Sequence, residues 1–276
     1  MRTRGIVSGA RKSAAEPFWT STFETTELDG WGEWSIVQGI IEGEGPGASH
    51  VFVGDAAALG VTPRTGTRAA HFRRPTVADD TPHAKCFVEW NMPGNTKDDY
   101  WNRPLKTLDL GGDPSGIYTA WCYNPVGSVV TTGEWSTIVQ FKEEGLDAQG
   151  VRTQHPSWGL GLSRQSAWPD LPPSDKPIFF VSHRNIDWPN VPWPGEDPEL
   201  PWVPVPEGRW FEIRVELREG LHSDWYIDGN FLYRALNSTW PVGRMTVTPE
   251  TWIYGIGYYE GQGTLLFDDC SFRRFP

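Results

Sequence analysis

The sequence is poor in cysteine, and its few cysteines form no recognisable pattern. Three occur in 276 residues, at Cys86, Cys122 and Cys270. Their number is odd, their spacing is wide, and no metal-ligand motif is present. We expect buried thiols, with one disulfide and a free thiol as the alternative. Thiols are compatible with folding in a reducing cytoplasm.

Long apolar runs are also missing. No segment approaches the length of a membrane-spanning helix. The basic residues 1–16 are not followed by the apolar stretch of a secretory signal peptide. We therefore expect synthesis in the cytoplasm without a signal peptide, and no membrane insertion.

Positive charge is scarce, since 24 Lys and Arg stand against 35 Asp and Glu, for a formal net charge of −11. No basic stripe offsets this balance, which argues against nucleic-acid binding. The six histidines show no H-x-H or H-E-x-x-H spacing, so a catalytic metal is not expected. Glu212 and Glu216 do not form the E-x-D-x-x-E arrangement, so a glycoside hydrolase is not favoured.

Tryptophan, glycine and proline are abundant, at 16, 30 and 24 residues. Indoles stack on sugar rings and pack at interfaces, although a coding bias is an alternative explanation. Segment 166–206 holds eleven prolines and four tryptophans, which predicts a long ordered loop for a glycan or a neighbouring subunit. We predict glycan contacts in this loop and in the polar connection 93–114, at Trp168, Trp188, Trp193, Tyr100 and Trp101.

Short alternating segments separated by turns dominate the chain. Trp252–Tyr259 and Thr264–Phe267 are predicted strands around a turn at 260–263, ended by Asp268 and Asp269. Asp224–Tyr233 is a predicted hairpin. Further strands are predicted at Phe18–Glu24, Trp34–Ile41, His50–Val53, Gly66–Arg73, Lys85–Trp90, Ile117–Tyr123, Glu134–Lys142, Trp158–Ser163, Ile178–His183 and Trp210–Glu216, with a turn or short helix at Asp55–Gly60. The pattern indicates an all-β jelly-roll sandwich over residues 18–276.

Residues 1–17 form a separate basic arm, with Arg2, Arg4, Arg11 and Lys12 against Glu16. The arm has no periodicity, so it becomes ordered only against a partner. We expect it to be an assembly contact with other copies or other subunits.

Several motifs occur in a particular order along residues 18–275. They are Phe23-Glu24, Gly66–Ala70, Trp135–Gln140, Trp210–Val215, the Trp-Tyr-Ile-Asp-Gly hairpin at 225–229, and Gly257–Tyr259. In this order they resemble concanavalin-like jelly-roll proteins, specifically the heparin- and alginate-lyase-like polysaccharide lyases. The group also includes laminin-G-like modules that only bind glycans.

The resemblance implies β-elimination on a uronate chain, in which a His or Tyr takes the C5 proton and a Tyr protonates the leaving oxygen. Gln140, Tyr259 and Arg68 match the family's Gln, Tyr and Arg. Lys142 stands where the family has His, and Gly255 where it has Lys. The catalytic set of an active enzyme is therefore Tyr259, Gln140, Arg68 and Lys142. The structural alternatives are a core or rim aromatic for Tyr259, a hydrogen-bonded strand residue for Gln140 and an ion pair for Arg68.

The resemblance also implies a structural Ca²⁺ between strands near the two ends of the domain. Glu24, Asp268 and Asp269 supply the hard oxygen ligands that Ca²⁺ prefers. The alternative is a set of strand-end carboxylates bonded to turn amides.

The incomplete catalytic set favours binding over cleavage. Our leading hypothesis is a virion-associated structural protein, of a phage tail or capsid decoration, with a glycan-binding jelly-roll domain. The alternative is a polysaccharide lyase acting on a uronate-containing polymer. A purely structural subunit is the third possibility.

Overall fold

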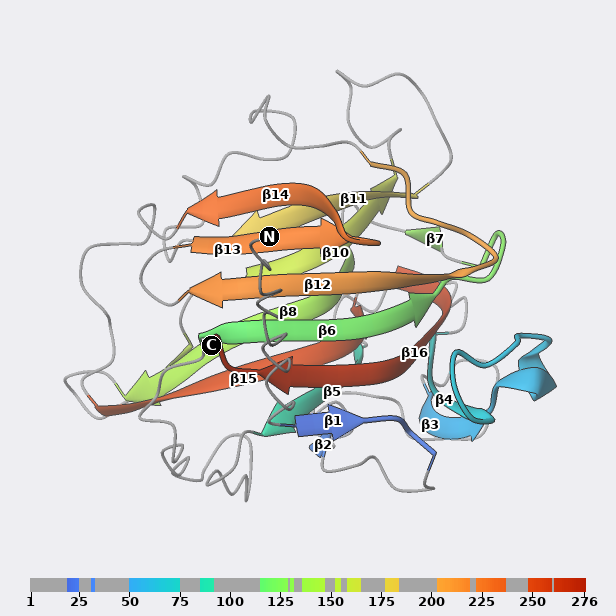
Figure 1. Ribbon diagram of the computed structural model, residues 1–276, viewed down its shortest axis with the longest axis horizontal. Helices are drawn as coiled ribbons and strands as arrows, with labels where there is room; N and C mark the ends of the chain where they lie inside the picture. Colours follow the sequence, from blue (N-terminus) through green and yellow to red (C-terminus); the bar gives the residue numbers. More distant parts are fainter. Residues whose placement is uncertain are drawn as a thin grey trace, which may run out of the picture.

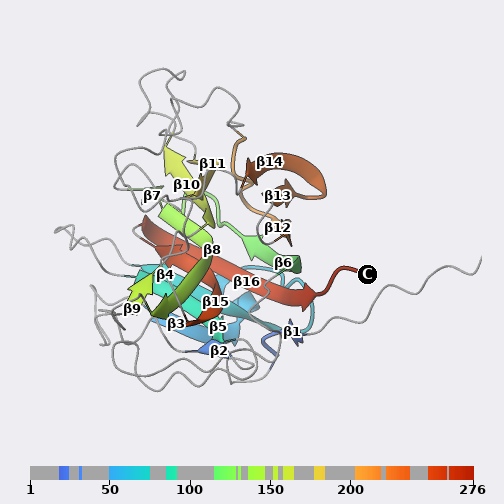
Figure 2. The ribbon, with the colours of Figure 1, turned by 90° about the vertical axis from the view of Figure 1, so that its left-hand side faces the viewer.

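The computed structural model of the chain describes residues 19–24, 31–32, 50–74, 85–91, 115–128, 130–131, 136–146, 152–154, 158–164, 177–183, 203–218, 222–236, 248–259 and 261–276. In these ranges the regular elements are β-strands and one short 3₁₀ helix, η1 (Ala56–Leu59). The strands form two antiparallel sheets that stack as layers (Figures 1 and 2). The expected all-β sandwich is confirmed. None of the described helices is long and apolar enough to cross a membrane.

The larger sheet has nine strands, in the order β14-β13-β12-β6-β16-β4-β3, with β1 and β7 also paired to β16. Their bounds are β1 (Trp19–Ser21), β3 (His50–Asp55), β4 (Arg68–Arg74), β6 (Gly116–Tyr123), β7 (Val130–Thr131), β12 (Trp210–Arg218), β13 (His222–Ile227), β14 (Asn230–Leu236) and β16 (Gly261–Arg273).

The smaller sheet has seven strands, in the order β11-β10-β8-β15-β5-β2, with β9 paired to β8. Their bounds are β2 (Trp31–Gly32), β5 (Lys85–Asn91), β8 (Ser136–Leu146), β9 (Arg152–Gln154), β10 (Trp158–Arg164), β11 (Pro177–His183) and β15 (Thr248–Tyr259).

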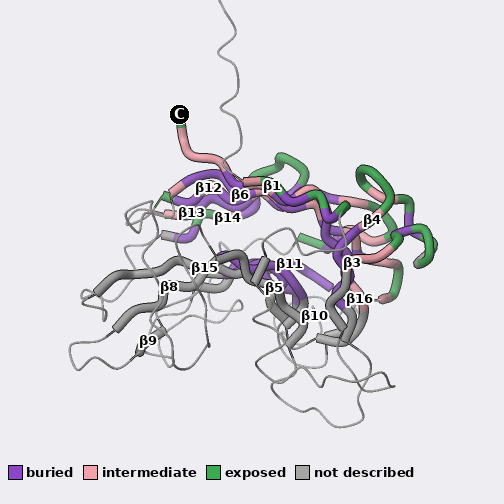
Figure 3. The backbone as a smooth tube through the Cα atoms, turned by 90° about the horizontal axis from the view of Figure 1, so that it is seen from below, coloured by how far each residue is buried: buried purple, intermediate pink, exposed green. Residues whose placement is uncertain are grey.

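The core lies between the two layers because every second residue of a strand points inward. On β12, Phe211, Ile213, Val215 and Leu217 are buried, and the residues between them are partly exposed. The tube coloured by burial shows the same buried segments along β6 and β12 (Figure 3).

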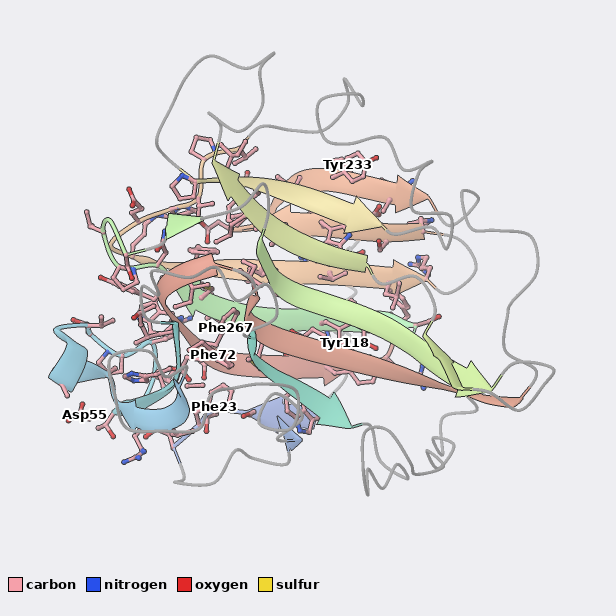
Figure 4. The ribbon with its side chains drawn as sticks, turned by 180° about the vertical axis from the view of Figure 1, so that it is seen from behind. Phe23, Asp55, Phe72, Tyr118, Tyr233 and Phe267 are labelled. Carbon is pink, nitrogen blue, oxygen red and sulfur yellow. The ribbon has the colours of Figure 1, made fainter. Side chains whose placement is uncertain are left out.

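Aromatic pairs join the two sheets across the core. The ring centroids of Tyr118 and Tyr254 lie 5.1 Å apart, and those of Phe179 and Phe211 lie 5.7 Å apart. Tyr118 lies between the layers in Figure 4. Each such ring stabilises the fold by about 1.5–3 kcal/mol through burial.

The C-terminal strands differ from their prediction in two ways. The chain enters β16 already at Gly261, and β16 continues past Asp268 and Asp269 to Arg273. A bulge between Asp268 and Ser271, where Asp269 has a φ of 43°, lets both carboxylates lie inside the strand. In addition, β15 and β16 belong to different sheets, so the turn between them connects the two layers.

Within the Trp/Pro-rich segment 166–206, the predicted strand Ile178–His183 is confirmed as β11. β11 is the outer strand of the seven-stranded sheet, and Ile178 bridges to Pro204. The predicted strand Trp34–Ile41, the connection 93–114 and the arm 1–17 lie outside the described residues.

Cys122 and Cys270 are free and buried, as expected. Burial raises the pKa of both thiols, and the thiolate is the reactive form. We therefore expect that the two remaining thiols of a folded Cys86→Ser variant do not react with Ellman's reagent. In denaturant both thiols should react. Rapid reaction of the folded variant would contradict the buried placement.

Candidate functional site

Gln140 lies in the middle of the seven-stranded sheet, between two glycines. It is opposite Gly159 of β10 on one side and opposite Gly255 of β15 on the other. Each of these two strands has a second glycine two residues further on. Gly161 of β10 is opposite Thr137 of β8, and Gly257 of β15 is opposite Phe87 of β5. We call Gly159, Gly161, Gly255 and Gly257 the glycine strip.

By strand register the glycine strip belongs to the face of the sheet that points away from the core, and all four of its glycines are buried. Leu160, Val139 and Ile256 are buried in the core and are cross-strand partners of one another. Because successive positions alternate between faces, Gly159, Gln140 and Gly255 belong to the opposite face. Glycine inside a strand commonly marks a place where a ligand or another backbone approaches closely.

Two other predicted residues belong to the same face by register. Lys142 is opposite Ile253, two positions along from the pair Gln140 and Gly255. Tyr259 is opposite Thr137 of β8 and Lys85 of β5, beyond a bulge at which Gly257 has a φ of 156°. The backbone therefore places the positions of Gln140, Lys142 and Tyr259 along one face of β8 and β15, with Lys142 and Tyr259 at opposite ends of the row.

Arg68 lies elsewhere. It belongs to β4 in the nine-stranded sheet, where it is opposite Asp55. Its Nη2 donates to the carbonyl oxygen of Val53 at 2.9 Å, and its buried Nε has no partner among the described residues. The structure does not place Arg68 in the same layer as Gln140. The predicted glycan contacts Trp168, Trp188, Trp193, Tyr100 and Trp101 lie outside the described residues.

Glu24, Asp268 and Asp269 converge on the connection between η1 and β4. Glu24 accepts hydrogen bonds from the backbone amides of Thr67 and Arg68, each at 3.1 Å. The Asp268 carboxyl accepts from the amides of Thr65 at 3.3 Å and Asp269 at 2.8 Å. Asp269 accepts from the Thr65 hydroxyl at 2.8 Å. We call these three residues the carboxylate clamp, because they hold residues 65–68 from two ends of the chain.

Asp268 is fully buried in this clamp. Burial raises the pKa of its carboxyl to about 7, and the nearby charges of Asp269 and Glu24 act in the same direction. The amides of Asp269 and Thr65 oppose the shift. A carboxyl group in these surroundings is close to half protonated at neutral pH.

The backbone around the clamp is strained. Phe23 has a φ of 55° and Asp269 a φ of 43°, and non-glycine residues avoid this left-handed region by roughly 1–2 kcal/mol each. Gly66, with a φ of 52°, faces the Glu24 carboxylate so closely that a Cβ there would overlap with it. Clustered carboxylates and strain at one place are typical of a site with a function.

The donor chemistry of the clamp suits Ca²⁺, since all its side-chain donors are carboxylate oxygens. Among the described residues, however, no group of three or more His, Cys, Asp or Glu side chains is arranged to hold a metal ion. The carboxylates are bonded to the loop instead, which is the alternative that the sequence left open.

The glycine strip was not predicted from the sequence, although the sequence contains a signal for it. Strand β10 reads Trp-Gly-Leu-Gly-Leu from Trp158, and β15 reads Tyr-Gly-Ile-Gly-Tyr from Tyr254. Glycines two apart in a strand share one face. What the sequence does not show is that β8 lies between these two strands.

No protein-family model and no curated protein sequence matches the chain. Among solved structures, the cellulose-induced protein Cip1 is similar with a TM-score of 0.47 and 12% identity, over 93% of this chain and 97% of that one. A carbohydrate esterase of the Shiga toxin-encoding bacteriophage phi24B is similar with a TM-score of 0.42 and 12% identity, over 92% of this chain and 98% of that one. An alginate lyase from Pseudomonas aeruginosa is similar with a TM-score of 0.40 and 10% identity, over 75% of this chain and 83% of that one. At this level of similarity these likenesses carry no argument about activity.

Proposed function

We propose that the protein binds a polysaccharide on the outer face of the seven-stranded sheet, along the glycine strip. The observation that carries this proposal is the position of Gln140 between Gly159 and Gly255. A residue with glycine on both neighbouring strands has no side chains beside it in the strand-pairing direction. Backbone rather than side chains would then lie beneath a flat sugar ring, although the four glycines are themselves buried in the structure.

The residue types on this face fit the hydroxyl groups of a sugar. A glutamine amide has both donors and an acceptor, as a hydroxyl requires. The positions of Lys142 and Tyr259 add a cation and a phenol on the same strands. Each hydrogen bond of this kind contributes about 0.5–1.5 kcal/mol, so binding depends on several of them together.

A polysaccharide lyase is the second candidate, favoured by the common face of Gln140 and Tyr259. Two findings weigh against it. Lys142 stands where the resemblance expects a histidine base, and an ordinary lysine is protonated at neutral pH. Arg68, the expected partner of the substrate carboxylate, lies in the other sheet and is bonded to Val53.

A glycan array, followed by titration of the best ligand, tests the binding proposal. A Gln140→Ala variant with unchanged thermal stability should bind the same ligand roughly three- to tenfold more weakly. In parallel, alginate, heparin and glucuronan are incubated with the protein, and the ultraviolet absorbance of unsaturated uronate is followed. A steady rise that Tyr259→Phe abolishes would favour the lyase, and no ligand on any array would contradict both.

We place this binding domain in a virion, as a phage tail or capsid-decoration subunit that assembles through residues 1–17. The support is electrostatic: the arm carries Arg2, Arg4, Arg11 and Lys12, while the whole chain has a net charge of −11. A basic arm is attracted to an acidic neighbouring copy. Light scattering should show an oligomer for the full chain and a monomer for residues 18–276, whereas equal masses would remove this support.

We also propose that the carboxylate clamp takes up Ca²⁺ by exchanging loop amides for the ion. Calcium at about 100 times its Kd should then raise the free energy of unfolding by about 2.7 kcal/mol over protein in EDTA. Thermal denaturation measures this shift, with Mg²⁺ as the ion control. A Glu24→Gln variant should lose most of the effect. Equal melting temperatures in calcium and in EDTA would leave the clamp bonded only to its loop.

A further inference from the structure

A second surface of interest lies on the outer face of the nine-stranded sheet, in the layer opposite to the glycine strip. β12, β14 and β16 all finish toward the left of Figure 1, and five arginines lie on these strands or directly after them. These residues, which we call the arginine face, are Arg214, Arg218, Arg234, Arg273 and Arg274.

Strand register shows that these residues are neighbours. Glu216 of β12 is opposite Asp224 of β13 on one side and Ile117 of β6 on the other. Asp224 is in turn opposite Arg234, and Ile117 is opposite Arg273. One row of the sheet therefore runs from Arg234 to Arg273 across five strands, with Arg214 and Arg218 two positions to either side of Glu216.

The described acids within the arginine face are each already paired. Asp224 accepts two hydrogen bonds from Arg234, both at 2.6 Å. Glu216 lies 3.6 Å from Arg214. Among the described residues, the arginine face therefore combines five guanidinium groups with two carboxylates, in a chain whose net charge is −11. The Arg273 side chain makes no hydrogen bond or ion pair with the part of the chain that the structure describes.

Aromatic rings hold the arginines in place. The Arg214 guanidinium carbon lies 4.1 Å from the centre of the Tyr226 ring, and that of Arg218 lies 3.9 Å from Phe275. Arg274 donates from Nη1 to the carbonyl oxygen of Ser115 at 3.0 Å. Stacked guanidinium groups keep their edges available for planar anions and lose less side-chain entropy on binding than free ones.

The next row of the sheet adds groups of another kind. The hydroxyls of Thr119 and Ser271 are hydrogen-bonded at 2.5 Å, beside Arg214. Phe231 is 58% exposed and lies edge-on to Tyr226, with ring centroids 5.6 Å apart. Hydroxyls and an exposed aromatic ring next to a cationic row match a polymer that combines anionic groups with sugar rings.

We propose that the arginine face binds an anionic polysaccharide through its carboxylate or sulfate groups. Charge complementarity favours this face, because the chain apart from the arginine face and the basic arm 1–17 is acidic and repels such a polymer. The surface is distinct from the glycine strip and does not depend on it.

Heparin is a suitable probe, with neutral dextran as the comparison. Heparin should bind with an affinity that falls steeply as salt rises, since the arginine residues involved are all at least partly exposed. An Arg218→Gln/Arg273→Gln variant should bind roughly tenfold more weakly. The matched control is Arg64→Gln/Arg209→Gln, which removes the same charge from the same sheet face beyond the arginine face; Arg64 lies over Trp121 and Arg209 pairs with Asp228.

The control variant should retain the affinity of the wild type, and Arg218→Lys/Arg273→Lys should recover most of it. Equal losses in the test and control variants would overturn the proposal, as would salt-independent binding or equal binding of dextran. Tighter binding of double-stranded DNA than of heparin would overturn the assignment to a polysaccharide. The Gly255→Ala variant should bind heparin as tightly as the wild type. The proposal for the glycine strip and the proposal for the arginine face can therefore be contradicted independently.

Discussion

Replacing Asp268 with asparagine is expected to shift the pH dependence of stability by about 4 kcal/mol in metal-free buffer. Burial raises the pKa of this carboxyl from 3.8 to about 7 in the folded protein. Between these values the folded chain holds a proton that the unfolded chain has lost, so stability falls as pH rises. Asparagine is neutral throughout and lacks this dependence.

Urea denaturation in EDTA at about pH 4 and about pH 8 measures the effect. Between the lower and the higher pH, the free energy of unfolding of Asp268→Asn should rise by about 4 kcal/mol relative to that of the wild type. Glu207→Gln is the control, since it changes a carboxylate that accepts from the amide of Gly127 in an exposed turn. The same difference between Asp268→Asn and wild type at both pH values would show that Asp268 is ionised in the fold.

Gly66→Ala should destabilise the protein by about 3 kcal/mol. The left-handed backbone conformation accounts for roughly 1–2 kcal/mol of this destabilisation, because it is unfavourable for any residue with a Cβ. The remainder arises because the new methyl group overlaps with the Glu24 carboxylate and separates it from the amides of Thr67 and Arg68.

Gly60→Ala separates these two contributions. Gly60 has a φ of 72°, and a Cβ there meets no atom within 4 Å. It should therefore show the backbone strain alone, roughly 1–2 kcal/mol. Urea denaturation of both variants compares them directly, and equal losses would mean that the clamp adds nothing to stability.

Much of the fold was predictable because strand signals are local. Alternation in Trp210–Glu216 and the turn in Asp224–Tyr233 predict β12, β13 and β14, and these elements are confirmed. The bulge at Asp269 was not predictable, because its positive φ comes from the surroundings of β16 rather than from a glycine.

The composition of the candidate site depends on which strands become neighbours, and this information is not local. Arg68 and Gln140 fit one motif order, yet they fold into different sheets. The glycine strip exists because β8 lies between β10 and β15, although β10 follows β8 in the chain and β15 comes some ninety residues later. Single strand patterns contain no such pairing information.

The glycine strip is the central element of the proposed function, and a binding titration on filled variants tests it most directly. Gly159→Ala and Gly255→Ala each add a methyl group beside Gln140 on the outward face, at positions without a positive φ. Each variant should keep the circular dichroism spectrum of the wild type. Each should bind the glycan identified on the array tenfold or more weakly, which corresponds roughly to the loss of one or two hydrogen bonds. Full affinity in both variants would contradict binding along the strip.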